Sequence, residues 1–314
     1  MGLNVILLSK IMHQTTSPVL FIIFNRPETT AAVFEQIRLA KPLRLYIAAD
    51  GPRVDHPDDI VLCRQSRQEV ETIDWDCELK TLYRDENAGC KYGVSAAISW
   101  FFDQDEEGII LEDDCLPANS FVRFCDVMLE KYRDDDRVWH ITGCNLQFGQ
   151  QWGSASYYFS NRCHVWGWAS WRRVWQAYDI ELSRYNENEV YPLMQNIYGD
   201  ARVAAAWTTI FKDVKAGTVN SWAYPLDFTV FFNNGLVIIP NVNLVSNIGF
   251  TADATNTYQP NNDYDGIPPQ ELGEITHPDL MVPQKQADLF IINYHFNLAK
   301  KKRSGKWWKL KFGK

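Results

Sequence analysis

The 314-residue sequence lacks long apolar segments and shows no cysteine pair with metal-binding spacing. Its longest apolar runs, at residues 19–24 and 236–240, fall far short of the roughly 18 residues that a membrane-spanning helix requires. The apolar patch at residues 5–8 is too short for the core of a secretory signal, so we expect a cytoplasmic protein. The seven cysteines, odd in number and without a CxxC pair, favour reduced thiols over disulfides or structural zinc.

Basic residues are scarce outside the C-terminal end. The formal net charge is −8, but residues 300–314 carry eight Lys or Arg and no acid, so residues 1–299 carry a net charge of −16. A body this acidic argues against nucleic acid as a partner. The basic tail also contains aromatic residues such as Trp307 and Trp308. It therefore predicts peripheral attachment to an anionic membrane surface, with a solvated terminus as the alternative.

Apolar runs alternate with helical patterns over the first 117 residues. Strands are predicted at 17–24, 43–49, 78–83 and 108–111, and helices at 28–39, 60–73 and 93–103. This alternation predicts an α/β fold with a mixed, mostly parallel sheet flanked by helices. Farther along, helices are expected at 120–133 and 201–216, strands at 138–142, 236–239 and 242–245, and a long loop at 251–283.

Polar clusters follow the first four predicted strands. They are Asn25-Arg26, Asp50, Arg84 to Asn87, and Glu112-Asp113-Asp114. In open α/β sheets ligands bind at the carboxyl ends of the strands, so these clusters should converge on one crevice. Three consecutive acids repel one another unless a cation neutralises them, and carboxylates suit Mn²⁺ or Mg²⁺. The pattern predicts a metal-assisted site for a nucleotide diphosphate; a solvated acidic turn is the alternative.

The same residues carry a family resemblance. The Glu112-Asp113-Asp114 triplet after an apolar strand resembles the DXD-type motif of GT-A glycosyltransferases, in the version of N-acetylglucosaminyltransferase I. The wider sequence resembles bacterial nucleotide-diphospho-sugar transferases of surface-glycan synthesis, through FNRP at 24–27, RDENAGCK at 84–91, GIILEDDCLP at 108–117 and NVNLVSNIGF at 241–250. The resemblance implies a single GT-A (Rossmann-like) domain at 17–299, with a donor half (17–117) and an acceptor half (118–299), an extension at 1–16 and the tail at 300–314.

The resemblance also implies roles for matching residues. Asp114 would be the direct ligand of Mn²⁺ or Mg²⁺, while Glu112 and Asp113 would contact the ribose or the sugar of the donor. Arg26 and Asp50 match positions that hold the base and the ribose, which implies a UDP-sugar.

Two further cations are candidates for the donor site. Lys91 falls near a family position that contacts the nucleotide. Arg84 can present a guanidinium fork to a phosphate, or pair with a neighbouring acid such as Asp85.

A tryptophan cluster gives a second candidate contact. Gly167, between Trp166 and Trp168, would let a sugar approach the backbone closely, so these three residues are predicted to touch the substrate. The alternative is core packing, because Trp168, Trp171 and Trp175 have the spacing of one helical face.

Inverting transfer needs a carboxylate that deprotonates the acceptor hydroxyl. In many relatives an Asp directly follows a Trp in this role, whereas here Ala223 follows Trp222. We therefore predict Asp227, about one helical turn farther along, as the base; a charge stabilised by the helix dipole is the alternative. Asp253 and Asn256 lie where relatives often carry a His near the diphosphate, which is a second departure.

The sequence thus predicts an inverting, metal-dependent hexosyl- or N-acetylhexosaminyltransferase that uses a UDP-sugar and a glycan or lipid-linked acceptor. A non-catalytic nucleotide-sugar-binding relative is the alternative that Ala223 and Asn256 favour. A sugar nucleotidyltransferase is less favoured, because the segment 25–28 after the first strand is not a Gly-rich basic loop.

Overall fold

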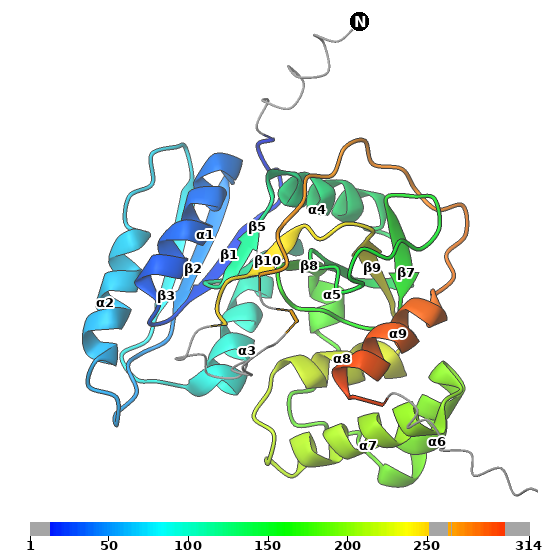
Figure 1. Ribbon diagram of the computed structural model, residues 1–314. Helices are drawn as coiled ribbons and strands as arrows, with labels where there is room; N and C mark the ends of the chain where they lie inside the picture. Colours follow the sequence, from blue (N-terminus) through cyan, green and yellow to red (C-terminus); the bar gives the residue numbers. More distant parts are fainter. Residues whose placement is uncertain (1–12, 251–262, 265, 299–314) are drawn as a thin grey trace, which may run out of the picture.

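The computed structural model describes residues 13–250, 263–264 and 266–298. Its centre is an eight-stranded sheet with the strand order β3-β2-β1-β4-β8-β6-β9-β7 (Figure 1). Four of its seven strand pairings are parallel and three are antiparallel. The strands are β1 (Val19–Ile23), β2 (Arg44–Ala49), β3 (Glu78–Tyr83), β4 (Glu107–Glu112), β6 (Val138–Thr142), β7 (Tyr157–Ser160), β8 (Trp168–Trp171) and β9 (Leu236–Pro240). The predicted Rossmann-like α/β fold, with a mixed, mostly parallel sheet, is confirmed.

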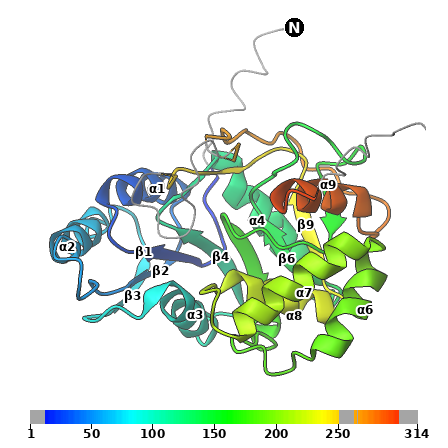
Figure 2. The same cartoon turned by 60° about the horizontal axis from the view of Figure 1, so that its bottom comes forward.

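The first half of the chain is a regular β-α-β unit. Helices α1 (Pro27–Ala40), α2 (Asp59–Glu69) and α3 (Gly89–Phe102) connect β1, β2, β3 and β4, which pair in parallel. Strand β1 is apolar throughout because both faces of the sheet are covered: Val19 and Phe21 pack on the side of α1, and Leu20 on the side of α3. Figure 2 shows α1 and α2 on one face of these strands and α3 on the other. The carboxyl ends of the four strands therefore meet at one edge.

The second half adds helices around the remaining strands. A pair of short antiparallel strands, β5 (Cys115–Pro117) and β10 (Val245–Asn247), lies beside the end of β4. Helices α6, α7, α8 and α9 lie together (Figure 1), and they share a separate apolar cluster that contains Trp207. The helices are α4 (Asn119–Lys131), α5 (Arg172–Trp175), α6 (Glu187–Tyr198), α7 (Ala201–Lys215), α8 (Ala223–Phe232) and α9 (Lys285–His295). No helix in the described part of the chain is long and apolar enough to cross a bilayer.

Some predicted elements are wrong. Trp168 and Trp171 lie on strand β8, which is buried on both faces, and only Trp175 lies on a helix. Helix α2 ends at Glu69 rather than at residue 73, and the predicted strand at 242–245 is replaced by β10. The basic tail, Asp253 and Asn256 lie outside the described residues.

Candidate functional site

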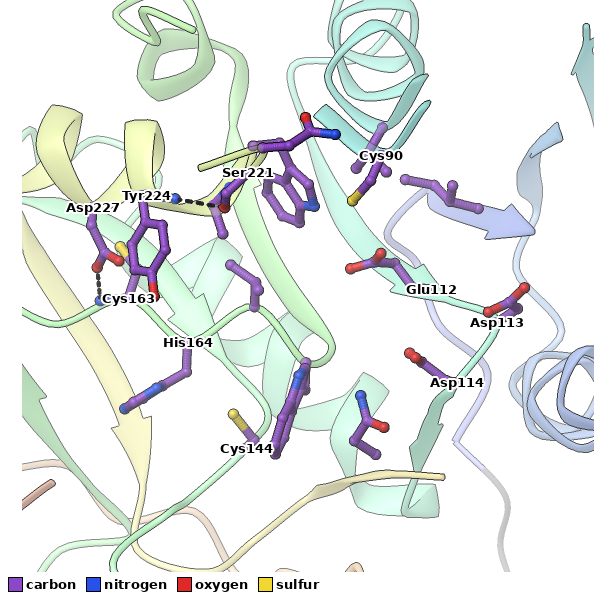
Figure 3. Close-up of a pocket in the computed structure, with 18 of the residues that line it drawn as sticks. Cys90, Glu112, Asp113, Asp114, Cys144, Cys163, His164, Ser221, Tyr224 and Asp227 are labelled. Carbon is purple, nitrogen blue, oxygen red and sulfur yellow. Dashed lines mark hydrogen bonds between the residues drawn. The ribbon is translucent and has the colours of Figure 1, made fainter. Parts of the chain in front are cut away.

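A cavity of about 1200 Å³ opens at the carboxyl ends of β1, β2 and β4. All four predicted polar clusters contribute to its walls, through Arg26, Asp50, Arg84, Asn87, Glu112, Asp113 and Asp114. Figure 3 shows the acidic triplet at the end of β4. The predicted convergence of these distant segments is therefore confirmed. Their roles toward a ligand stay predictions.

The acidic triplet begins where β4 ends. The Asp113 carboxylate accepts a hydrogen bond from the Phe24 backbone N at 3.0 Å, and Nη1 of Arg26 lies 2.8 Å from Oδ2 of Asp114 and 3.7 Å from Oδ1 of Asp113. Burial, together with the neighbouring acids, raises the pKa of Glu112 to about 8 and that of Asp113 to about 7. The site thus holds more carboxyl groups than the single Arg26 can neutralise.

The donor atoms allow one type of metal site. Within the described residues, no group of three or more His, Cys, Asp or Glu side chains could hold a metal ion by itself. Mg²⁺ typically takes one or two carboxylates and completes its octahedron with water and substrate phosphates. Asp114, which faces the cavity, fits that smaller protein contribution. The residues present therefore suit an ion that binds together with a diphosphate.

Gly249 closes over the ion pair between Arg26 and Asp114. A Cβ at this position would lie 2.4 Å from Oδ2 of Asp114 and 2.8 Å from Nη1 of Arg26, so only glycine fits without displacing the pair. The backbone N of Gly249 donates to Oδ1 of Asn247, which also lines the cavity. This packing explains the glycine in the segment 241–250, a role that the sequence alone did not indicate.

Asp50 is held by the start of helix α3. Its carboxylate accepts hydrogen bonds from the backbone N of Ala88 at 2.9 Å and of Gly89 at 3.0 Å, and from Nδ2 of Asn87 at 3.1 Å. A carboxylate at a helix N-terminus also interacts favourably with the helix dipole. Asp50 therefore fixes α3 against β2, whether or not it also contacts a ribose.

The cations of the cavity match the predicted ones only in part. Lys91 does not line it: its buried ammonium lies 3.5 Å from Glu181. Arg53, which sequence reasoning missed although it follows the same strand end as Asp50, lines the cavity and pairs with Asp59 at 2.6 Å. Arg84 also lines it and, within the described residues, forms no ion pair, which leaves its guanidinium for a phosphate.

Of the predicted tryptophan cluster, one residue reaches the cavity. Trp166 lines it. Gly167 has a φ of 61°, and a Cβ there would lie 2.7 Å from Cγ2 of Val245, so this glycine serves close packing of the chain. The ring of Trp168 is fully buried and stacks on Trp222 at 5.9 Å. Trp168 is therefore a core residue with no surface for a sugar.

Asp227 lies on helix α8 at the other side of the cavity from Glu112 (Figure 3). One carboxylate oxygen pairs with the Arg162 guanidinium, and the other accepts a hydrogen bond from the Cys163 backbone N at 3.1 Å. Burial raises the pKa of Asp227, and the charge of Arg162 opposes that rise. Arg162 in turn lies over the Trp207 ring at 4.6 Å. The predicted base is thus present in the cavity wall, but it is held by an arginine that the sequence did not reveal.

No known family model and no curated protein matches the sequence. Among solved structures, HddC from Yersinia pseudotuberculosis is similar, with 10% identity and a TM-score of 0.30. The matched region covers 51% of this chain and 80% of the HddC chain. A UDP-glucose pyrophosphorylase complexed with UDP-glucose is also similar, with 8% identity and a TM-score of 0.29. The matched region covers 52% of this chain and 79% of the pyrophosphorylase chain. Both likenesses are too low to support an inference about function.

Proposed function

We propose that this chain is a metal-dependent glycosyltransferase that transfers a sugar from a UDP-sugar to a hydroxyl of a glycan or lipid-linked acceptor, with inversion. The observation that carries the proposal is the position of the acidic triplet and Asp227 on two sides of one cavity. Inverting transfer needs this separation, because the hydroxyl attacks the anomeric carbon from the face opposite the departing diphosphate.

The donor would bind at the carboxyl ends of β1, β2 and β4. Arg84, which has no acidic partner in the described structure, would hold the diphosphate, and Glu112 would accept a hydrogen bond from a sugar or ribose hydroxyl. Asp114 would hold a Mn²⁺ or Mg²⁺ ion, which supplies positive charge to the leaving diphosphate. Arg26 already lies against Asp114 and would turn to the phosphate or the base as the ion binds.

The acceptor would approach from the side of Asp227. As the new C–O bond forms and the bond to the diphosphate breaks, the acceptor proton would pass to a carboxylate oxygen of Asp227. The charge of the Arg162 guanidinium favours the ionised form of this carboxyl, against the effect of burial. It must also loosen its hold for the oxygen to accept a proton.

Calorimetric titration of UDP tests the donor site. We expect UDP to bind in the presence of Mn²⁺, and to lose detectable binding in EDTA or in an Asp114→Ala variant. Asp76→Ala, which removes an exposed acid outside the cavity, is the matched control and should bind UDP as the wild type does. If no nucleoside diphosphate binds under any of these conditions, the donor-site proposal is wrong.

A second candidate is a nucleotide-sugar-binding protein without transferase activity. The observation that favours it is the closed pair of Asp227 with Arg162, together with Ala223 where relatives have an Asp. Hydrolysis of a panel of UDP-sugars by the wild type and by Asp227→Asn separates the two. An enzyme should lose about 10²–10⁴-fold in rate in the variant while its UDP affinity is unchanged. UDP binding without turnover of any donor would favour the second candidate.

A sugar nucleotidyltransferase is tested with the same panel of UDP-sugars after addition of pyrophosphate. Conversion of a UDP-sugar and pyrophosphate to UTP would overturn the glycosyltransferase proposal. The segment between β1 and α1 spans only residues 24–26 and contains no glycine. It therefore does not supply the Gly-rich loop that would cradle a triphosphate.

A further inference from the structure

Three aromatic side chains form a surface, which we call the aromatic platform, beside the cavity. The platform consists of Phe148 from the segment after β6, Tyr264, and Tyr294 of α9. The Phe148 ring stacks on Tyr264 with centroids 5.8 Å apart and an angle of 16°, and it lies 4.9 Å from the Tyr294 ring. Tyr264 and Tyr294 also line the cavity that holds Asp227. The platform is thus continuous with the acceptor side of the cavity.

Two features of the platform are unfavourable for the stability of the fold. Phe148 is 42% exposed and Tyr294 is 40% exposed, while the buried Tyr264 stacks against the Phe148 ring. Phe148 also has a φ of 50°, in the left-handed region that bulky residues avoid. Keeping an aromatic ring exposed on a residue with a strained backbone makes folding less favourable. Such residues concentrate at ligand sites.

The polar groups around the platform indicate the chemistry of its ligand. The Tyr294 hydroxyl donates a hydrogen bond to the Asp263 carboxylate, and Asp263, Asn293 and Asn297 line the cavity wall nearby. Carboxylate and amide groups beside aromatic faces suit a sugar ring, which offers an apolar C–H face and a rim of hydroxyl groups. A carboxylate would repel a phosphate or an acidic sugar.

We infer that the aromatic platform is a binding subsite for a neutral oligosaccharide, with one sugar ring stacked on Phe148 and the chain leading toward Asp227. Binding itself follows from the platform alone. The identification of this glycan as the acceptor rests on the proposed function.

A glycan array probed with the full-length protein, without nucleotide or metal, tests the inference. We expect the wild type to bind a subset of neutral oligosaccharides. Phe148→Ala should weaken that binding at least tenfold, and Phe148→Trp should restore it. Tyr92→Ala, which removes another exposed aromatic ring away from the platform, should stay within twofold of the wild type. Saturation-transfer NMR with the best array ligand should show transfer to one face of a sugar ring.

Three results would overturn the inference. They are an array without neutral ligands for the wild type, binding limited to acidic glycans, and equal binding by Phe148→Ala. UDP titration into Phe148→Ala separates this test from that of the proposed function. Phe148→Ala should bind UDP as the wild type does. Glycan binding by the wild type without UDP binding would refute only the donor site, whereas UDP binding by the wild type without glycan binding would refute only the platform.

Discussion

Two arginine–aspartate pairs face the same cavity, and they differ in how completely each is closed. In the pair of Arg26 and Asp114 the side chains are 20% and 16% exposed, and Glu112 and Asp113 add further carboxyl groups beside it. In the pair of Arg162 and Asp227 the side chains are 12% and 4% exposed, and both carboxylate oxygens of Asp227 already have donors. The first pair has an excess of acid and can take up a cation. In the second pair, one positive charge faces one negative charge.

The difference bears on what each pair can do. An excess of buried carboxyl groups is costly until protons or a metal compensate it, so the Arg26 side is prepared for a ligand that brings positive charge. A closed pair mainly fixes the position of its members, since breaking it leaves an uncompensated buried charge. Under the proposed function, a ligand would complete one wall of the cavity, and the pair in the other wall would open before Asp227 accepts a proton.

Removing Arg162 should have the largest effect on stability. Arg162→Gln leaves Asp227 buried without its partner, so we expect the free energy of unfolding to fall by about 3–5 kcal/mol. Arg26→Gln should cost less than Arg162→Gln, because the pair with Asp114 is more exposed and the neighbouring carboxyls can take up protons. Urea denaturation of both variants at pH 7 measures the contrast.

The double variant Arg162→Gln/Asp227→Asn is the control for this prediction. It removes both charges, so it should recover most of the lost stability. Equal losses for Arg162→Gln and Arg26→Gln would show that the two pairs do not differ in the way that their burial indicates.

Asp288 offers a pH-dependent test of the same wall. Its carboxylate accepts hydrogen bonds from Oγ of Ser160 at 2.5 Å and from the Asn161 backbone N at 3.1 Å, with the charges of Arg162 and Asp227 nearby. Burial raises its pKa to about 6. Because the folded state keeps the proton longer than the unfolded state does, the stabilising contribution is present below the ordinary Asp pKa and is lost as the pH rises through about 6.

Comparison of the wild type with Asp288→Asn isolates this contribution, since all other titrating groups are shared. The stability of the wild type relative to the variant should fall by about 3 kcal/mol between about pH 4 and pH 6, and then stay constant. Chemical denaturation of both proteins across this range measures the difference. A difference that rises with pH, or does not change, would contradict a raised pKa.

The two walls also differ in how well the sequence predicts them. On the donor side, each strand is a local apolar run and each polar cluster follows it directly, so the crevice of Asp50, Arg84 and the acidic triplet could be predicted from periodicity and one rule of sheet topology. Arg53 could also have been predicted to line this crevice, because it lies three residues after Asp50 at the same strand end.

On the other wall the local signals were ambiguous or absent. Strands β7 and β8 are four residues each, and the spacing of Trp168, Trp171 and Trp175 fits a helix as well as it fits a strand followed by a helix. Arg162 and Asp227 are 65 residues apart. Arg162 follows β7 and Asp227 lies on α8, so only the tertiary structure brings them together. Asp227 could be chosen as a candidate base, but its partner could not, because the pairing depends on tertiary structure.

The smallest of the expected effects concerns metal affinity on the open wall. Arg26→Gln removes the guanidinium that lies 2.8 Å from Asp114, so a divalent ion no longer competes with it. We expect Mn²⁺ without nucleotide to bind severalfold tighter to the variant, by about 1 kcal/mol for a competitor at a partly exposed site. UDP should bind the variant more weakly, because Arg26 is predicted to contact the nucleotide. Electron paramagnetic resonance of free Mn²⁺ and UDP calorimetry measure the two changes.

Arg53→Gln is the matched control for Arg26→Gln. Arg53 lines the same cavity, but its partner is Asp59 rather than the acidic triplet, so Mn²⁺ affinity should stay within about twofold of that of the wild type. Opposite shifts for Mn²⁺ and UDP in Arg26→Gln alone would show that Arg26 is the built-in counter-ion of the donor site. Weaker Mn²⁺ binding in that variant would instead show that Arg26 organises the acids for the metal, and the distinction between an open and a closed wall would no longer hold.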